Sequence, residues 1–589
     1  MNNRTLLFSL WLILFGILLG SCKKNEPVTP DISITDTISI PEGTLHEYKV
    51  IIPVTLSVAT DKQVSLSWST TENTALAGED YLAVNGAYLV FNPGETSKNI
   101  EVLIFSDSIF EPDETFSVTI SSVRNANVIS YKTMVTVKND DAFDPDPPHA
   151  DISWWLTKPD KSALLSKQIA GLYFSSEFNL FSIINVDTNQ TYQQIDGFGF
   201  ALTGGSAYLI NNLTSVKRAE LLNELFLLDD NSIGISYLRV SIGASDLSLS
   251  VFSYDDMPSG QTDVNLTNFS LGPDKTDLIP VLKSILSLNP KIKILGSPWS
   301  PPLWMKSNKN SVGGRLLPEY YDAYARYFVR YINEMKAEGI PIDAITIQNE
   351  PLNPYNNPSM EMSATEQRDF IKNNLGPAFQ AAGLTTKIIL YDHNCDHPEY
   401  STTILSDADA AKYIDGSAFH LYAGDISALS TVHNAFPDKN IYFTEQYVGG
   451  PSNFAGDLKW HMQNVIIGAT RNWSKNVIEW NLASDPSYGP HTNGGCSNCE
   501  GALTISSGYT RNVSYYIIAH ASKFVPAGSV RIASNNLSDL PNVSFKTPSG
   551  QKVLIVLNNS SSTKTFNIVY GRRQAQTSLS SGAVATYVW

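Results

Sequence analysis

The stretch Ile345-Thr346-Ile347-Gln348-Asn349-Glu350-Pro351 is an apolar run that ends in an amide and a carboxylate. It is the fourth of eight short apolar runs between about residues 193 and 524, and stretches of helical spacing such as 320–336 and 365–382 separate them. Alternating strands and helices predict a parallel sheet, and eight repeats predict a closed (β/α)8 barrel, or TIM barrel. The predicted strands are 195–198, 235–242, 292–296, 344–348, 388–391, 417–420, 441–444 and 477–481.

A second carboxylate follows the seventh run, in Ile441-Tyr442-Phe443-Thr444-Glu445. Strands four and seven lie across a small barrel from each other, and catalytic residues of this fold come from the C-terminal ends of strands. A single Glu in such a place is more often a helix cap or an ion-pair partner. Two that face one pocket can supply the acid and the nucleophile, or base, that glycoside hydrolysis requires. Asn349, beside Glu350, is placed to bind the 2-hydroxyl of the sugar.

The composition of the 589-residue chain fits several globular domains. Lys and Arg number 41 and Asp and Glu number 57, which gives a net charge of −16. An excess of negative charge disfavours nucleic acid and anionic membrane surfaces as partners. Aromatic residues make up 11% of the chain, which suits a protein whose ligands are flat, hydroxylated rings.

The N-terminus has the order of a secretory signal: Arg4, a mostly apolar run over 6–19, and then small residues. Leu19-Gly20-Ser21-Cys22 resembles a bacterial lipobox, which implies a signal peptide at 1–21 and a lipid on Cys22. The alternative is an ordinary signal peptide that leaves Cys22 as a free thiol. We therefore expect an exported lipoprotein, anchored at the outer-membrane, periplasmic or cell-surface face, whose body does not enter the membrane.

Three further cysteines, Cys395, Cys496 and Cys499, cannot all pair within the chain. The spacing of Cys496 and Cys499 favours a disulfide that staples a loop. Half of a zinc site and a redox motif are the alternatives, although no second Cys/His pair completes a zinc site.

Residues 31–141 contain short alternating runs separated by Gly, Asp and Asn, the pattern of a β-sandwich. Ala77-Gly78-Glu79-Asp80-Tyr81, Phe91-Asn92-Pro93-Gly94-Glu95 and Glu111-Pro112-Asp113-Glu114 resemble a Calx-β domain over nearly the whole segment. The resemblance implies a spacer or adhesive module and a Ca²⁺ site, for which carboxylates at the turns are suitable ligands. The alternative is that these acids are solvated and bind nothing. The candidate ligands are Glu42, Asp80, Asp107, Glu111 and Asp141.

Two further parts complete the expected organisation. Asp144-Pro145-Asp146-Pro147-Pro148 predicts a stiff linker over 142–151. Strand-like patterns over 152–192 and 525–589 flank the predicted barrel, 193–524, and are expected to form one side β-sandwich.

From about residue 183 to the C-terminus, the chain resembles glycoside hydrolase family 30, within the glucosylceramidase-like superfamily. The resemblance implies a (β/α)8 barrel with a side β-sandwich, which agrees with the pattern of strands and helices. The motifs that carry it are Gln194-Ile195-Asp196-Gly197-Phe198-Gly199, Leu238-Arg239-Val240, Ser245-Asp246, Ser297-Pro298-Trp299-Ser300-Pro301-Pro302-Leu303-Trp304, Asn349-Glu350-Pro351, His420, Tyr422, Thr444-Glu445, Trp480-Asn481 and Ala585-Thr586-Tyr587-Val588-Trp589.

The resemblance implies that Glu350 is the acid/base and Glu445 the nucleophile of a retaining mechanism that needs no cofactor. Retention predicts carboxyl groups about 5–5.5 Å apart. We also expect Glu350 to titrate above Glu445, because an ionised nucleophile disfavours a second negative charge nearby. The residues that the resemblance places around the sugar are Arg239, Asp246, Trp299, Asn349, His420, Tyr422 and Trp480.

Two loops of the predicted barrel bear on the substrate. The loops at 391–396 and 491–499 look most like the bacterial β-1,6-glucanase branch, which implies a polysaccharide substrate. The runner-up is a glucosylceramidase-like β-glucosidase, or a β-xylosidase, with the same catalytic pair. A lipid-anchored carbohydrate-binding or adhesion protein without catalysis is the alternative from another class, and the presence of both carboxylates argues against it.

Overall fold

The computed structural model describes residues 29–43, 48–78, 80–106, 112–140, 151–175 and 179–589. It divides into two compact units, Met1–Pro148 and His149–Trp589. Cys22 and the expected signal peptide lie outside the described residues, as does the expected linker except for its last residue. None of the helices in the described ranges combines the length and apolar composition that a membrane span requires.

The first unit contains two β-sheets that share one core. Alternate side chains of β3 (Tyr48–Leu56) are buried, as expected for a strand with one face on the core. Tyr81 stacks on Phe116 within this core, with ring centroids 4.1 Å apart. The sheets are β6 (Ser97–Ile104), β3, β1 (Asp31–Ile34) and β8 (Asn127–Ser130), and β2 (Thr37–Pro41), β9 (Lys132–Lys138), β7 (Glu114–Arg124), β4 (Val64–Glu72) and β5 (Ala87–Phe91).

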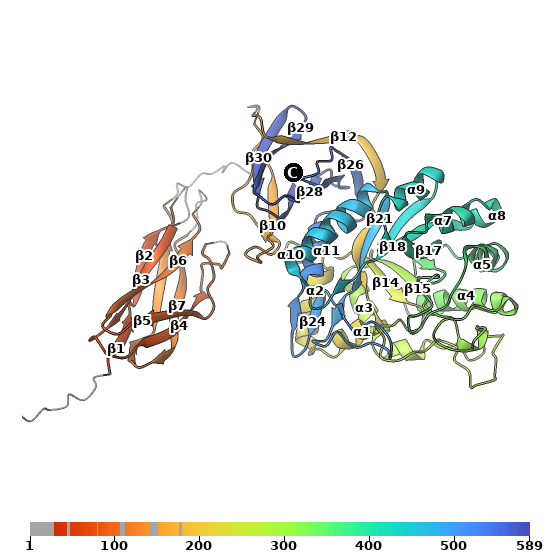
Figure 1. Ribbon diagram of the computed structural model, residues 1–589, viewed down its shortest axis with the longest axis horizontal. Coiled ribbons are helices and arrows are strands. Elements are labelled where there is room, and N and C mark those ends of the chain that lie inside the picture. The colour runs from red at the N-terminus through yellow and green to blue at the C-terminus, as the bar shows by residue number, and fades with distance from the viewer. Residues whose placement is uncertain (1–28, 44–47, 79, 107–111, 141–150, 176–178) are drawn as a thin grey trace, which may run out of the picture. The chain divides into compact units, whose positions relative to one another are not determined.

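The second unit contains the predicted closed barrel of eight parallel strands (Figure 1). Apolar side chains from seven of its strands, including Tyr237, Leu295 and Tyr442, form a separate cluster that fills the barrel. The strands are β13 (Gly197–Ala201), β14 (Tyr237–Ser241), β15 (Lys293–Ser297), β16 (Ala344–Thr346), β17 (Lys387–Cys395), β18 (Ile414–Gly424), β19 (Asn440–Glu445) and β21 (Ser474–Asn481).

The first barrel strand begins later than its apolar residues predict. The strand was expected at 195–198, and the observed strand, β13, starts two residues later, at Gly197. A Cβ atom at Gly199 would lie 1.8 Å from the carbonyl oxygen of Tyr237 on β14. Glycine therefore allows the two strands to approach where a side chain would collide.

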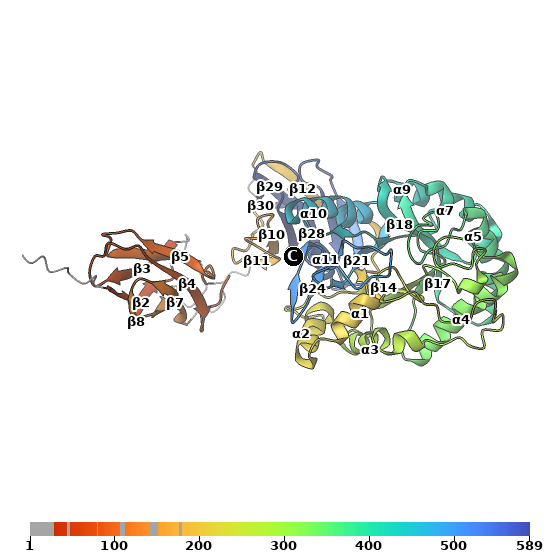
Figure 2. The ribbon, with the colours of Figure 1, turned by 60° about the horizontal axis from the view of Figure 1, so that its bottom comes forward.

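Helices form the outer layer of the barrel, and Figure 2 shows several of them arranged around its strands. α4 (Tyr321–Ala337) buries Tyr324, Phe328 and Tyr331 on the face toward the barrel, at helical spacing. The other helices are α1 (Gly204–Asn211), α2 (Ser215–Phe226), α3 (Leu278–Leu288), α5 (Ala364–Phe370), α6 (Gly376–Ala381), α7 (Pro398–Leu405), α8 (Ala408–Ala411), α9 (Ala428–Ala435), α10 (Phe454–His461) and α11 (Val513–Ser522), with π-helical segments Ile371–Leu375 and Met462–Ala469.

Strands from both sides of the barrel sequence form the side β-sandwich. They make one nine-stranded sheet, in which β10 pairs with the C-terminal strand β31 and β12 pairs with β26 and β29. In spatial order the strands are β11 (Ser166–Lys167), β10 (Ser153–Thr157), β31 (Val584–Val588), β28 (Lys552–Leu557), β27 (Asn542–Lys546), β26 (Val530–Ser534), β12 (Ser182–Gln194), β29 (Lys564–Tyr570) and β30 (Arg573–Leu579).

Candidate active site

Glu350 and Glu445 meet at the C-terminal end of the barrel. Glu445 is the last residue of β19, and Glu350 follows β16 with a backbone φ of 46°, in the left-handed region. Each side chain is buried. One carboxylate oxygen of each residue and one ring nitrogen of His420 all lie within 4.8 Å of one another. Such closeness agrees with the spacing of retaining glycosidases and leaves too little room for the water of an inverting one.

Arg239 on β14 holds the Glu445 carboxylate. Its fully buried guanidinium donates to Oε2 of Glu445 at 2.5 Å, to Oδ2 of Asp392 at 2.7 Å and to Oδ1 of Asn349 at 2.8 Å. The hydroxyl of Tyr422 donates to Oε1 of Glu445 at 2.9 Å. A buried guanidinium needs such partners, and together these donors hold the Glu445 carboxylate in one orientation.

His420 on β18 connects the carboxylates of Glu350 and Glu445. Its Nδ1 atom lies 3.3 Å from Oε1 of Glu350 and 3.9 Å from Oε1 of Glu445. Its Nε2 atom lies 3.1 Å from Oδ1 of Asp392. The hydroxyl of Thr444 also donates to Oδ1 of Asp392, at 2.6 Å. Asp392, which directly follows the fifth predicted strand, therefore contacts both Arg239 and His420.

The charges in this cluster reverse the expected titration order. Burial would raise the pKa of Glu350, but the His420 imidazolium lowers it to about 2. Burial raises the pKa of Glu445 in spite of His420 and Arg239. Burial opposes the charge on His420, yet Glu445, Asp392 and Glu350 raise its pKa to about 9. The expectation that Glu350 titrates above Glu445 was therefore wrong, because His420 lowers the pKa of Glu350 whereas burial raises that of Glu445.

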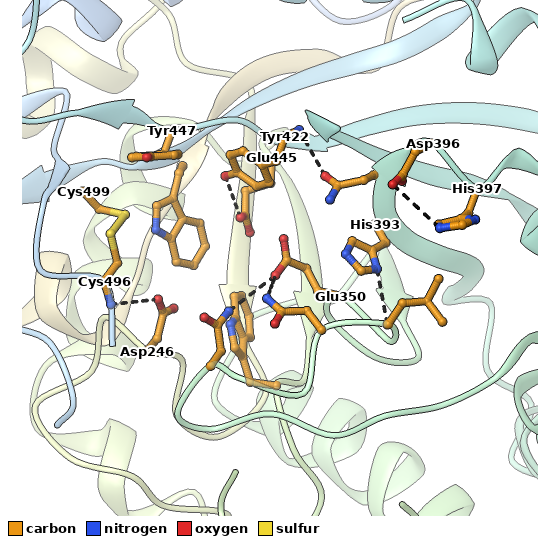
Figure 3. Close-up of a pocket in the computed structure, with 16 residues that line it drawn as sticks. Asp246, Glu350, His393, Asp396, His397, Tyr422, Glu445, Tyr447, Cys496 and Cys499 are labelled. Carbon is orange, nitrogen blue, oxygen red and sulfur yellow. Dashed lines mark hydrogen bonds and ion pairs between the residues drawn. A yellow bond between two sulfur atoms is a disulfide. The ribbon is translucent and has the colours of Figure 1, made fainter. Parts of the chain in front are cut away.

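Glu350 and Glu445 line a cavity of about 540 Å³ (Figure 3). Its inner end is formed by Trp299, Trp480 and Asp246, all of which are buried. The two indole rings lie 5.3 Å apart at an interplanar angle of 33°, with the Arg239 guanidinium over both. Flat aromatic faces beside carboxylates are suited to the apolar and hydroxylated surfaces of a pyranose ring.

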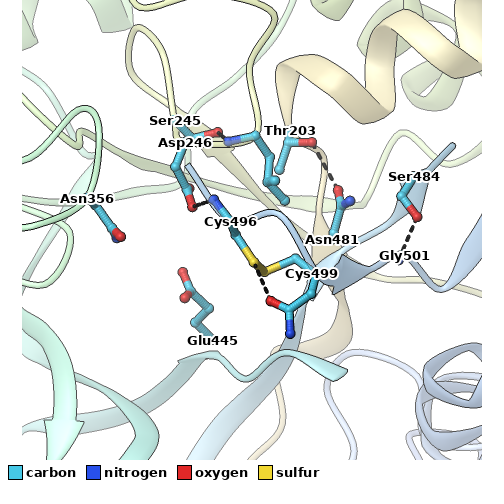
Figure 4. Close-up of a disulfide and its surroundings, with 12 residues drawn as sticks. Thr203, Ser245, Asp246, Asn356, Glu445, Asn481, Ser484, Cys496, Cys499 and Gly501 are labelled. Carbon is cyan, nitrogen blue, oxygen red and sulfur yellow. Dashed lines mark hydrogen bonds between the residues drawn. A yellow bond between two sulfur atoms is a disulfide. The ribbon is translucent and has the colours of Figure 1, made fainter. Parts of the chain in front are cut away.

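A disulfide between Cys496 and Cys499 closes one wall of this cavity (Figure 4). The backbone N–H of Cys496 donates to Oδ2 of Asp246 at 3.3 Å, and Oδ1 of Asp246 has no partner among the described residues. Burial raises the pKa of Asp246 to about 7. Cys395 is buried as a free thiol, so the loop staple forms between Cys496 and Cys499 alone.

The structure brings all nine predicted site residues to this end of the barrel. Glu350, Glu445 and four of the predicted sugar contacts line the cavity, whereas Arg239, Asn349 and His420 lie directly behind the carboxylates. Their individual roles stay predictions. The sequence interpretation missed further polar residues of the site: Asn353, Asn356, Asp392, His393 and Tyr447. Asp392 carried a usable signal, because it follows an apolar strand as Glu350 and Glu445 do.

The candidate calcium ligands are only partly described. Asp107, Glu111 and Asp141 lie outside the described residues. Glu42 is buried, and Oδ2 of Asp80 accepts a hydrogen bond from the backbone N–H of Leu76 at 2.6 Å. Calcium binding by this unit stays a prediction.

A closed (β/α)8 barrel whose strand ends place two carboxylates this close, in a cavity with aromatic walls, defines a glycoside hydrolase of the retaining class. The chain belongs to glycosyl hydrolase family 30: the model of the family's TIM-barrel domain matches residues 195–525, and that of its beta sandwich domain matches residues 528–587. The model of the Calx-beta domain matches residues 36–142.

Several known proteins are similar to this chain. An endo-1,6-beta-D-glucanase of Neurospora crassa is 40% identical, over 57% of this chain and 72% of the fungal protein. The lysosomal acid glucosylceramidase of Mus musculus is 29% identical, over 69% of this chain and 83% of the mouse protein. Among solved structures, the endo-beta1,6-glucanase BT3312 is 36% identical with a TM-score of 0.71, and the match covers 75% of this chain and 99% of that one.

Proposed function

We propose that this chain hydrolyses β-1,6-linked glucan with retention of anomeric configuration. The paired carboxylates Glu350 and Glu445 support the reaction, and the similarity to two endo-1,6-glucanases, at 36% and 40% identity, supports the linkage. Glu445 attacks the anomeric carbon while Glu350 protonates the departing O6 oxygen. Water then attacks the glycosyl-enzyme with Glu350 as the base.

The neighbouring side chains have distinct parts in this mechanism. Arg239 and Tyr422 favour the ionised form of Glu445 against the effect of burial, and their 2.5 Å and 2.9 Å hydrogen bonds aim its carboxylate at the sugar. His420 holds the proton that Glu350 must donate, and the 3.3 Å contact between them allows its transfer. Once the covalent intermediate removes the charge of Glu445, Glu350 can act as a base.

Product analysis on linear β-1,6-glucan tests the proposal. We expect the first product detected by NMR to have the β configuration and chromatography to show oligosaccharides. First products of α configuration would overturn the retaining mechanism, and an intact glucan would overturn the linkage. Parallel assays on glucosylceramide test the alternative that the mouse relative favours.

The N-terminal sequence supports a second proposal, that the enzyme is exported and anchored through a lipid on Cys22. Radiolabelled palmitate should enter the full chain expressed in a bacterium and should be absent from Cys22→Ala. Palmitate label in Cys22→Ala, or its absence from the wild type, would overturn the proposed lipid anchor on Cys22.

A further inference from the structure

The cavity has a second end, on the far side of Glu350 from Asp246 (Figure 3). This outer end is lined by His393, Asn394, Asp396 and His397. It differs from the inner end in exposure: the side chains of Asp396 and His397 are 41% and 51% exposed, whereas Asp246 is 4% exposed. The outer end is thus a polar mouth open to solvent.

Two barrel strands continue beyond the barrel and carry this mouth. Thr346, the last residue of β16, pairs with Ile389, but β17 continues to Cys395. Over this extension β17 stays paired with β18, and Cys395 lies opposite Gly424. Asp396 and His397 follow immediately, so the two-stranded extension of β17 and β18 carries them.

The position of Glu350, the proposed acid, determines on which side of the site the leaving sugar lies. Asn353 and Asn356 donate to Oε2 of Glu350 at 2.7 and 3.4 Å, and both line the cavity. Glu350 protonates the oxygen that leaves, so the sugar bearing that oxygen lies beyond it, away from Trp299 and Trp480. In a β-1,6 linkage the leaving oxygen is attached to an exocyclic carbon, which places the leaving ring one bond farther out than a ring-bound oxygen would.

We infer that Asp396 and His397 form an acceptor subsite, which binds ring hydroxyls of the leaving glucosyl unit; this rests on the proposed function. The Asp396 carboxylate accepts no hydrogen bond from the described residues, and its ion-pair partner His397 lies 3.7 Å away. Its oxygens are therefore free to accept two neighbouring hydroxyls. Nδ1 of His397 contacts Glu399 at 2.7 Å, which leaves Nε2 facing Asp396 and the cavity.

Two substrates with different leaving groups test this subsite. With Asp396→Ala, kcat/KM for a β-1,6-linked gluco-oligosaccharide should fall about ten- to hundredfold, the range for losing hydrogen bonds to a charged group. For 2,4-dinitrophenyl β-glucoside, whose leaving group has no hydroxyls, it should stay within about twofold. Asp396→Asn should lie between wild type and Ala. Asp409→Ala on the outer helix α8 is the matched control and should leave both substrates unchanged.

Equal losses on both substrates, or an unchanged oligosaccharide rate, would overturn the subsite. A wild type that cleaves the aryl glucoside but no β-1,6 linkage would overturn the proposed function instead. In that case the subsite is tested by the rate of glucosyl transfer from the aryl glucoside to methyl β-glucoside. A transfer rate that saturates with methyl β-glucoside and falls about tenfold in Asp396→Ala supports the subsite. Equal transfer rates in the wild type and the variant overturn it.

Discussion

The Nδ1 atom of His420 lies 3.3 Å from Oε1 of Glu350, so the imidazole and the proposed acid share one proton. His420 holds this proton in preference to Glu350, because its pKa of about 9 is far above the value of about 2 for Glu350. The two residues therefore titrate as a pair, and the pair loses its last proton only in alkaline solution.

The alkaline limb of the pH profile should depend on this pair. In the wild type, kcat/KM should fall as pH rises through about 9, the pKa of His420. In His420→Asn the proton must lie on Glu350 alone, and the pKa of a buried carboxyl beside Glu445 is higher than about 2 but lower than 9. The limb should then move to lower pH by more than about one unit. An alkaline limb that stays in place would contradict the shared proton.

Asp392→Asn should destabilise the barrel. Burial opposes its charge, yet Arg239 and His420 hold the pKa of Asp392 well below its ordinary value. A depressed pKa stabilises the fold above about pH 4, where unfolded Asp is ionised, and this stabilisation is lost as pH falls through the folded value. We expect the free energy of unfolding, from guanidinium titration at pH 7, to fall by about 3–5 kcal/mol.

The matched control for Asp392→Asn is Asp409→Asn, an exposed position that should change stability by less than about 0.5 kcal/mol. The difference in the free energy of unfolding between Asp392→Asn and the wild type should become smaller below about pH 4. If Asp392→Asn had the same free energy of unfolding as the wild type at pH 7, the contacts of Asp392 with Arg239 and His420 would not stabilise the fold.

The sequence predicts the barrel well because its evidence is local. Apolar runs such as 441–444 form the barrel strands, and their side chains fill the barrel or pack against the helices. Because parallel strands all end on one face of the barrel, Glu350 and Glu445, which follow two of these runs, must lie on that face. The position of Asp392 after an apolar run is a local signal, but its contacts are not. Tyr391 and Asp392 both have positive φ, at 74° and 66°, within an irregular stretch of β17. That turn brings Asp392 onto Arg239, 153 residues away in sequence, and no local pattern reports such a contact.

Local spacing also predicts the loop staple, which the disulfide between Cys496 and Cys499 confirms, while Cys395 is a buried free thiol. The titration order of Glu350 and Glu445 depends on the charge of His420, which sequence spacing does not give.

The two catalytic glutamates should respond differently to an added nucleophile. Glu445→Gln should lose at least about a thousandfold in kcat on every substrate, because no residue replaces its attack. Glu350→Ala should still form the glycosyl-enzyme from 2,4-dinitrophenyl β-glucoside, whose leaving group needs no acid. Azide should then accelerate turnover and give a β-glucosyl azide. Rescue of Glu445→Gln to the same β product would reverse the assignment.

The Cys496–Cys499 disulfide should act mainly on substrate binding. Cys499 pairs with Gly449 in β20–β23 (Val448–Gly449 and Cys499–Glu500), shortly after Glu445, while the Cys496 N–H holds Asp246. Cys496→Ser/Cys499→Ser frees this loop, so KM for β-1,6-glucan should rise several-fold while kcat, set by Glu350 and Glu445, changes little. The loss of a four-residue closed loop should lower the free energy of unfolding by only about 2 kcal/mol.

Reduction of the disulfide is the control. Dithiothreitol should raise KM of the wild type and of Cys395→Ser alike, but not that of the double variant. A fall in kcat with unchanged KM would mean that the loop supports the catalytic pair rather than Asp246.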